Sequence, residues 1–319
     1  MTNTPDIRLR LGTRASPLAL WQAEHVAERL ETLSEGRIAC DLVKFTTSGD
    51  KLTTERLINA GGKGLFTREL DRALDDGEID IGVHSLKDVP SALPAHHVFV
   101  AFPERADPRE GFLSPSAKSL SGLPEGAVLG TASLRREAQT LRARPDLQIV
   151  PFRGNVQTRM KKLEAGEAAA TYLAMAGLTR LGLDHLATAI SMDEMLTAPC
   201  QGIVACTARE NALPDVAMDA LSAMTCPKSR ASALAERAFL VELDGSCRTP
   251  IAAHLFHRPD GRGHFKGEVL SPDGTQTWQS ERQLDAGYSD ADLKSLGRSA
   301  GQEIRAAAGG DLPAFDDDA

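Results

Sequence analysis

Aromatic residues are scarce in this sequence and make up only 4% of its 319 residues. Proteins that bind single-stranded nucleic acid stack the bases on aromatic rings, so the composition disfavours that function. The formal net charge of −8 also disfavours a general binder of nucleic acid or of acidic membranes. An anionic partner would therefore have to be met by local clusters of arginine and lysine.

Cysteine is also infrequent, and its spacing does not suit cross-linking or zinc. The five cysteines are an odd number without a C-x-x-C pair, at Cys40, Cys200, Cys206, Cys226 and Cys247. This pattern speaks against a disulfide framework and a structural zinc site, and it favours a reducing, cytoplasmic location. No cluster of His, Asp and Glu has the spacing of metal ligands, so we expect no metal.

Long apolar runs are missing too. No stretch approaches the length needed to span a bilayer. The first residues, MTNTPDIRLRLG, lack the apolar region of a signal peptide. We therefore expect neither a membrane partner nor an export signal.

What the sequence does contain is an alternation of strand-like and helix-like stretches over its first two-thirds. This rhythm is typical of an α/β fold with largely parallel sheets. The stretches LGTRAS at 11–16 and LGTAS at 129–133 both place a Gly-Thr turn between a strand and a helix, which indicates two similar lobes. We expect strands at 7–12, 38–45, 79–84, 128–130, 148–151 and 168–173, and helices at 16–32, 65–74 and from about 133 and 155.

The final hundred residues differ in character. One helix is expected at 229–243 and a closing helix at about 290–307, and between them Pro-Asp-Gly occurs at 259–261 and 272–274, which is hairpin chemistry. This pattern predicts a small α+β third domain. The predicted boundaries are 1–103 with 200–222 for domain 1, 104–199 for domain 2 and 223–319 for domain 3.

Arginines lie at three strand-to-helix junctions, where a cation is normally unfavourable. A helix N-terminus carries partial positive charge and unpaired N–H groups, so a cation there costs a few tenths of a kcal/mol, up to about 1. Repetition of this cost suggests that an anion binds, although any single arginine could be a solvated surface residue. The arginines at the junctions are Arg14, Arg135 with Arg136, and Arg153, and Arg159 and Arg180 extend the set.

Two further stretches carry candidate functional groups. The GGKG loop at 61–64 is too short for a P-loop, but it could place Lys63 on a flexible lid, and Phe66 after it could be a core residue or a ring-stacking partner. Asp88 follows a predicted strand in HSLKDVP, where it could be catalytic or stabilise an Asx-turn. His84 in the same stretch is expected to be a packed strand residue.

Cys247 occupies an unusual place in VELDGSCRTPI at 241–251. Gly and Pro around it predict an exposed turn, and the neighbouring Arg248 favours the thiolate form of the thiol. Cys247 could therefore be a nucleophile, or simply a small residue that fills a turn.

Seven stretches together resemble the porphobilinogen deaminase family, in family order and over nearly the whole chain. The resemblance implies two lobes of the periplasmic-binding-protein type (type II) that flank a cleft, and a third domain that carries a covalent dipyrromethane cofactor. The stretches are GTRASPLALWQA at 12–23, GGKGLFTREL at 61–70, HSLKDVP at 84–90, GTASLRR at 130–136, RGNVQTR at 153–159, AGLTRLGL at 176–183 and DGSCRTPIAAH at 244–254.

The resemblance also implies a reaction and assigns roles. A hydroxymethylbilane synthase condenses four porphobilinogen molecules, with loss of ammonia, and by the family pattern Cys247 would hold the cofactor as a thioether and Asp88 would be the catalytic carboxylate. A monomer in the cytoplasm is implied. The cofactor would be bound by Lys87, Ser133, Arg135, Arg136 and Arg159, the substrate by Arg14, Ser16, Arg153 and Arg180, and the lid would carry Lys63 and Phe66.

Two departures from the family pattern and two rival functions accompany this interpretation. Ser246 replaces a glycine that is common before the cysteine, and Cys200 in PCQGIVA at 199–205 stands where glycine is usual. One rival is a two-lobed anion-binding protein, which would give Cys247 no role. The other is a cysteine hydrolase, whose base would be His254 or His257, although both are expected on a structural strand.

Overall fold

The computed structural model describes residues 5–51, 64–243 and 250–312. These residues form two compact units, one made of 5–51, 64–106 and 203–230, the other of 107–202, 231–243 and 250–312. Lys63 and Cys247, two of the predicted site residues, lie outside the described residues. The three predicted domains divide the chain more finely than these two units, and their boundaries stay a prediction.

The first unit is an α/β layer built on one five-stranded sheet with the order β2-β1-β3-β10-β4. β1 pairs in parallel with β2 and β3, whereas β10 runs antiparallel to both β3 and β4. The elements are β1 (Ile7–Arg14), α1 (Pro17–Leu33), β2 (Ile38–Phe45), α2 (Ser48–Lys51), α3 (Arg68–Asp75), β3 (Ile81–Ser85), β4 (His97–Ala101), β10 (Val204–Arg209) and α7 (Asp215–Met224).

Alternating apolar residues hold the first unit together. Leu9 and Leu11 of β1 and Val26 and Leu30 of α1 are buried in one cluster with residues of β3, β10 and α7. Helix α1 begins where predicted, because the Ser16 hydroxyl accepts a hydrogen bond from the Ala19 N–H and Pro17 follows at the first helical position. The end of β1 is thereby joined directly to a helix N-terminus.

The second unit begins with a sheet of closely similar design, in the order β7-β6-β8-β5-β9. β6 pairs in parallel with β7 and β8, and β5 runs antiparallel to β8 and β9. The elements are β5 (Glu110–Leu113), β6 (Val128–Gly130), α4 (Leu134–Ala143), β7 (Gln148–Val150), α5 (Val156–Glu164), β8 (Ala170–Ala174), α6 (Met175–Arg180) and β9 (Thr188–Ala189).

The Gly-Thr turns at 12–13 and 130–131, which the sequence repeats, occupy equivalent places in the two sheets. Thr13 lies near the end of β1, and Thr131 directly follows β6. Each of these strands lies between two parallel neighbours, second in the order of its sheet. The predicted pair of related α/β lobes is confirmed, although the sheets are less parallel than expected because each also contains antiparallel strands.

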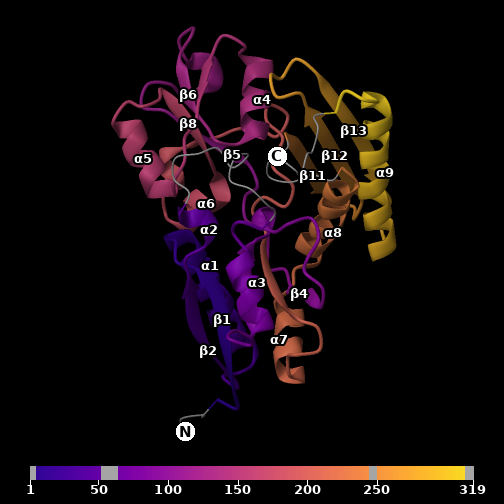
Figure 1. The fold of residues 1–319 in the computed structure, drawn as a ribbon. Coiled ribbons are helices and arrows are strands. Elements are labelled where there is room, and N and C mark those ends of the chain that lie inside the picture. Colours follow the sequence, from indigo (N-terminus) through magenta and orange to yellow (C-terminus); the bar gives the residue numbers. More distant parts are fainter. Residues whose placement is uncertain (1–4, 52–63, 244–249, 313–319) are drawn as a thin grey trace. The chain divides into compact units, whose positions relative to one another are not determined.

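The rest of the second unit is a three-stranded antiparallel sheet with helices, visible in orange and yellow in Figure 1. Phe239 and Phe265 meet in its core with ring centroids 5.4 Å apart. Its hairpin turns contain Gly261 and Gly274, both at positive φ, as the Pro-Asp-Gly stretches predict. The elements are α8 (Pro227–Glu242, which starts in the first unit), β11 (Ile251–His257), β12 (Gly263–Leu270), β13 (Thr277–Leu284) and α9 (Asp290–Ala308).

One predicted helix begins later than expected. The sequence predicts a helix at 65–74, but α3 starts at Arg68. Gly64 has a φ of +82° and its carbonyl accepts hydrogen bonds from the N–H groups of Thr67 and Arg68, so residues 64–67 form a turn instead. Phe66 therefore precedes the helix.

Candidate functional site

Asp88 lies in a single 3-10 turn, Leu86–Asp88, directly after β3. The turn is held to the first unit, because Leu86 and Val89 are buried and the Leu86 N–H donates a hydrogen bond to the Ile203 carbonyl. Lys87 and Asp88 are only half-buried. The Asp88 carboxylate makes no hydrogen bond or ion pair with any residue that the structure describes, so it is available to a ligand.

His84, on the same strand, is a packed residue as predicted. Its Nε2 lies 2.9 Å from the Thr207 hydroxyl. Burial, reinforced by His97 and Arg14, lowers the pKa of His84 to about 4. The imidazole is therefore neutral at physiological pH and serves the sheet.

Arg14 ends β1 two residues before the cap of α1. Its guanidinium contacts the Asp50 carboxylate and lies over the Phe66 ring, 4.4 Å from the centroid. Asp50 has a lowered pKa, because the hydrogen bonds from Arg14 and Thr47 outweigh the effect of burial. The structure thus brings together two predicted residues, Arg14 and Phe66, around an acid that the sequence analysis did not single out.

In the second unit, Glu110 joins two of the predicted arginines inside the protein. Arg135 Nη2 lies 2.5 Å from Glu110 Oε1, and Arg136 Nη2 lies 2.6 Å from Oε2. All three side chains are buried. Arg135 also donates to the Leu196 carbonyl and Arg136 to the Tyr172 carbonyl. Both arginines sit in the first turn of α4, which Ser133 caps by accepting a hydrogen bond from the Arg136 N–H.

Arg153 and Arg159 add two more cations to this region. Arg159 is half-buried and donates from Nε to the Gly154 carbonyl, 3.0 Å away. Burial and the neighbouring charges of Arg136 and Arg153 lower the pKa of Arg159 to about 10, which leaves it protonated at neutral pH. We call Arg135, Arg136, Arg153 and Arg159 the guanidinium cluster.

The guanidinium cluster concentrates positive charge in one region of the second unit. Glu110 is the carboxylate that hydrogen-bonds both Arg135 and Arg136. The Arg136 Nε is buried and has no hydrogen-bond partner within the part of the chain that the structure describes. A region with several guanidinium groups is suited to a ligand with several carboxylates.

Arg180 is the last residue of α6. Its Nη2 donates to the Gly202 carbonyl, 2.9 Å away, and burial lowers its pKa to about 10. It also remains a cation at neutral pH.

Glu110 and Asp50 are the residues that the sequence analysis missed. Glu110 is a lone charge at the start of a short apolar strand, β5, in the stretch REGFL at 109–113. Burial of a carboxylate costs free energy unless the carboxylate is paired. An acid in an apolar strand was therefore the one feature of the sequence that could have indicated a buried ion pair. The partners of Glu110 lie 25 and 26 residues away, a separation that no local pattern reveals.

The histidines needed by a cysteine hydrolase are engaged in the fold. His254 and His257 lie on β11, as predicted. His254 Nδ1 is 3.8 Å from Glu236 Oε1, and the two ring nitrogens of His257 lie near the hydroxyls of Ser232 and Tyr288. Hydrogen bonds thus hold His257 in the fold, and His254 is a buried residue of β11.

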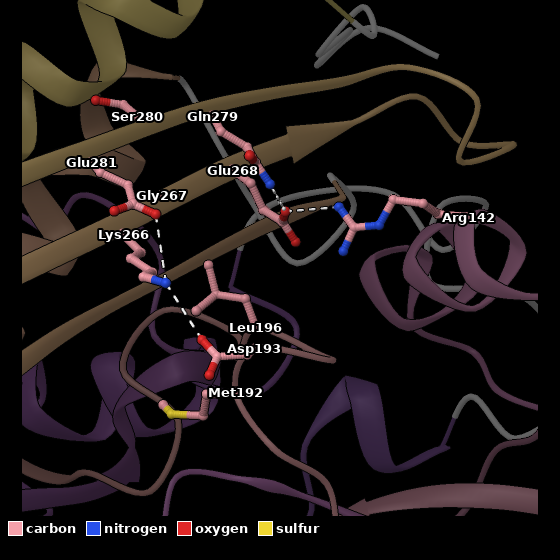
Figure 2. A pocket seen from close by; sticks show the side chains of 10 residues that line it. All are labelled: Arg142, Met192, Asp193, Leu196, Lys266, Gly267, Glu268, Gln279, Ser280 and Glu281. Atoms are coloured by element: carbon pink, nitrogen blue, oxygen red, sulfur yellow. Dashed lines mark hydrogen bonds and ion pairs between the residues drawn. The ribbon is translucent and has the colours of Figure 1, made fainter. Parts of the chain in front are cut away.

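A small pocket of about 100 Å³ lies in the second unit beside β12 and β13 (Figure 2). Its cations are already paired: Arg142 donates to Glu268, and Lys266 lies 3.4 Å from Asp193 and 3.5 Å from Glu281. The pocket contains none of the predicted site residues. It is thus a poor candidate for a site that binds carboxylates.

Two kinds of feature are absent from the described residues. Within them, no group of three or more His, Cys, Asp or Glu side chains could hold a metal ion. No helix among them is both long enough and apolar enough to cross a bilayer.

Comparison with known proteins identifies relatives over nearly the full length. Residues 9–214 match the family described as "Porphobilinogen deaminase, dipyromethane cofactor binding domain", and residues 231–306 match "Porphobilinogen deaminase, C-terminal domain". The porphobilinogen deaminase of Nitrobacter hamburgensis is 47% identical over 95% of this chain and 95% of its own length. That of Paracoccus denitrificans is 45% identical over 98% and 99%, and the chloroplastic enzyme of Pisum sativum is 44% identical over 94% and 82%.

Solved structures with a similar backbone include periplasmic solute-binding proteins. A methionine binding protein has a TM-score of 0.42 at 15% identity, covering 72% of this chain and 94% of its own. A TRAP periplasmic solute-binding protein from Desulfovibrio salexigens also has a TM-score of 0.42, at 12% identity and with 72% and 74% covered.

Proposed function

Because the chain belongs to the porphobilinogen deaminase family, we propose that Cys247, Asp88 and the guanidinium cluster serve one reaction on a growing pyrrole chain. The activity is that of a hydroxymethylbilane synthase, which condenses four molecules of porphobilinogen with release of ammonia. It uses a dipyrromethane cofactor. The residue roles that follow are our proposal.

The guanidinium cluster fits such a cofactor. Each pyrrole ring bears an acetate and a propionate, so two rings carry four carboxylates. The guanidinium cluster places several cations close together, since Arg135 and Arg136 share Glu110 and the charges of Arg136 and Arg153 act on Arg159, and such cations can pair with these carboxylates. The buried Arg136 Nε, which lacks a partner among the described residues, offers a further donor. The proximity of these guanidinium groups is the observation that carries the proposal.

We assign the cofactor-binding roles to Cys247, Lys87, Ser133 and three members of the guanidinium cluster. Cys247 would form the thioether, in the stretch between the end of α8 at Glu242 and the start of β11 at Ile251. When bound, the dipyrromethane supplies the pyrrole carbon to which the first substrate is joined. Arg136 and Arg159 would bind its acid side chains directly. Arg135 would act mainly through its charge, because its Nη1 and Nη2 already donate to Leu196 and Glu110.

The substrate-binding roles fall to Arg14, Ser16, Arg153 and Arg180. The guanidinium group of each of the three arginines can pair with an acetate or propionate of porphobilinogen. Phe66 and Lys63 are assigned to a cover over the substrate, as the family pattern implies. The contact between Phe66 and Arg14 supports a shared location for these two residues.

Asp88 is the proposed catalytic carboxylate. The anchored turn presents it with no partner among the described residues, so its oxygens can accept a hydrogen bond from a pyrrole N–H. The substrate ring becomes positively charged as ammonia leaves, and a carboxylate at that point stabilises the charge and directs the proton transfers.

Intact mass under denaturing conditions tests the covalent cofactor. We expect the purified protein to be heavier than its sequence by a two-pyrrole adduct, and the Cys247→Ser variant to have the bare sequence mass. An anion-binding protein or a cysteine hydrolase would show no adduct. A catalytically competent protein with an unmodified Cys247 would refute the proposed attachment.

The role of Asp88 is tested by Asp88→Asn, which keeps the side-chain volume. The variant should retain the adduct and the fold but lose about 10²-fold or more in kcat. Asp76→Asn, at the C-terminal end of α3, is the matched control and should keep full activity. Near-normal turnover by Asp88→Asn would remove Asp88 from the mechanism.

We also propose that the protein works as a monomer in the cytoplasm, without nucleic-acid or membrane partners, and that its three domains have the predicted boundaries. The net charge of −8 and the low aromatic content support the exclusion of such partners. The separate family matches to 9–214 and 231–306 support a third domain. Light scattering during gel filtration measures the molar mass in solution and so tests whether the protein is a monomer.

A further inference from the structure

Asp50 holds one edge of the Arg14 guanidinium. Asp50 lies on the short helix α2 (Ser48–Lys51) and reaches Arg14 at the end of β1. Arg14 Nε lies 3.3 Å from Asp50 Oδ2, and Nη2 donates to Oδ1. Two parallel hydrogen bonds of this kind fix both the position and the plane of a guanidinium group.

Asp50 is itself held in place. Its Oδ2 accepts hydrogen bonds from the Thr47 N–H and hydroxyl, at 3.1 and 2.8 Å. Thr47 is fully buried. The carboxylate is therefore held by a buried residue, Thr47, as well as by Arg14.

Phe66 completes the support from the face of the guanidinium. Its ring lies 4.4 Å from the Arg14 Cζ and is seated against Gly49, where an added Cβ would lie only 2.3 Å from the ring. A cation over an aromatic face is favourable, and more so when it is partly desolvated. Arg14 and Asp50 each keep 24% of their side-chain exposure, so the arrangement is partly open to solvent.

The remaining edge of Arg14 has no partner in the described part of the chain. Its Nη1 makes no hydrogen bond or ion pair with residues 5–51, 64–243 or 250–312. We propose that Asp50 is a positioning residue, which holds Arg14 so that this edge receives an acid side chain of porphobilinogen. The inference rests on the proposed substrate-binding role of Arg14.

Steady-state kinetics of Asp50→Asn test this inference. Asn removes the charge but keeps the volume, so Arg14 loses its fixed plane. We expect the KM for porphobilinogen to rise about 10-fold, which corresponds to about 1.4 kcal/mol, while kcat changes less than twofold and the cofactor adduct is retained. A lower KM would mean that Asp50 competes with the substrate for Arg14 and would overturn the proposal.

Asp80→Asn is the matched control. The Asp80 carboxylate accepts hydrogen bonds from Nε and Nη2 of Arg10, which lies on β1 like Arg14. Asp80→Asn therefore also removes a carboxylate that pairs with an arginine of β1, but at a position away from the site. This variant should lower the melting temperature without changing KM. An equal rise of KM in both variants would show that Asp50 has only a structural role and would overturn the proposal.

A double-mutant cycle separates failure of this inference from failure of the proposed function. If Asp50 acts through Arg14, Asp50→Asn has no further effect on KM in an Arg14→Gln background. An Arg14→Gln variant with unchanged KM would refute the role of Arg14 itself. A raised KM in Arg14→Gln with an unchanged KM in Asp50→Asn would refute the positioning role alone.

Thr47→Val serves if Asp50→Asn does not fold. It removes the hydroxyl that donates to Asp50 and keeps the side-chain shape. We expect KM to rise in the same direction by a smaller factor, and an unchanged KM in this folded variant would contradict the inference.

Discussion

Glu110→Gln offers the sharpest test of the buried charge arrangement in the second unit. The substitution keeps the shape of the side chain but removes the one carboxylate that hydrogen-bonds Arg135 and Arg136 in the described region. Glu110 is completely buried, and the arginine side chains are 5% and 8% exposed. Two guanidinium charges would therefore remain inside the protein without their counter-ion.

The expected loss follows from this geometry. Removal of one partner from a buried ion pair costs about 3–5 kcal/mol, because the other charge stays desolvated. For a unit of this size, 1 kcal/mol corresponds to about 2–4 °C in melting temperature. We therefore expect the transition of the second unit to fall by about 6–20 °C.

Calorimetry and urea unfolding measure this loss, with Asp260→Asn as the control. Asp260 pairs with Arg262 on the surface of the same unit, where both side chains are about half exposed. Such exposed pairs contribute about 0–1 kcal/mol, so the control should be close to the parent protein. A Glu110→Gln variant within 1 kcal/mol of the parent would refute the reasoning.

Three further variants extend these tests. In the folded parent protein His84 has a pKa of about 4, whereas in the unfolded chain it takes up a proton near pH 6.5. The free energy of unfolding should therefore fall by about 3 kcal/mol as the pH drops from 6.5 to 4. Denaturant unfolding at a series of pH values should show that His84→Gln lacks this part of the pH dependence. Gly297→Ala should destabilise the third sheet and its helices by at least 1–3 kcal/mol in thermal unfolding, because its Cβ would lie 2.2 Å from the Ala235 carbonyl oxygen. Arg159→Gln should fold, because its Nε bonds only the Gly154 carbonyl among the described residues, yet intact mass should show poor retention of the cofactor; full loading would contradict the proposed role.

Local chemistry made much of the fold predictable. Ser16 and Pro17 fix the start of α1, and the strand at 38–45 is found as predicted because its apolar residues and β-branching are local signals. The pairing of β10 with β3 and β4 was not predictable in this way, since it joins residues more than a hundred positions apart. The glycines of GGKG predicted a loop at 61–64, but no local pattern indicated that residues 64–67 form a turn and that α3 begins only at Arg68.

The candidate site shows the same division between local and distant information. The arginines at the strand-to-helix junctions could be recognised as candidate anion-binding residues, because a cation at a helix N-terminus is unfavourable unless an anion binds there. Their immediate counter-ions, Glu110 and Asp50, were not, because sheet topology and a short helix bring them there. For Arg135 and Arg136, part of the anion that the sequence predicted is supplied by the protein itself.

Cys200 shows how a departure from a family pattern acquires a physical meaning. The sequence places cysteine where the family usually has glycine, and the backbone there has a φ of +64°. Side chains other than glycine are strained in this region by about 1–2 kcal/mol. The Cys200 N–H donates to the buried Glu236, a contact that helps to hold the strained backbone in place.

The insertion of β10 between β3 and β4 has a consequence for how the protein emerges from the ribosome. The strands β1 to β4 are complete by residue 101, but the strand that pairs with both β3 and β4 begins only at residue 204. Until then β3 exposes an unpaired edge, the kind of surface that invites wrong strand pairing. The unit made first by the ribosome is thus finished only after the entire 107–202 segment, and then β10 and α7, have been synthesised.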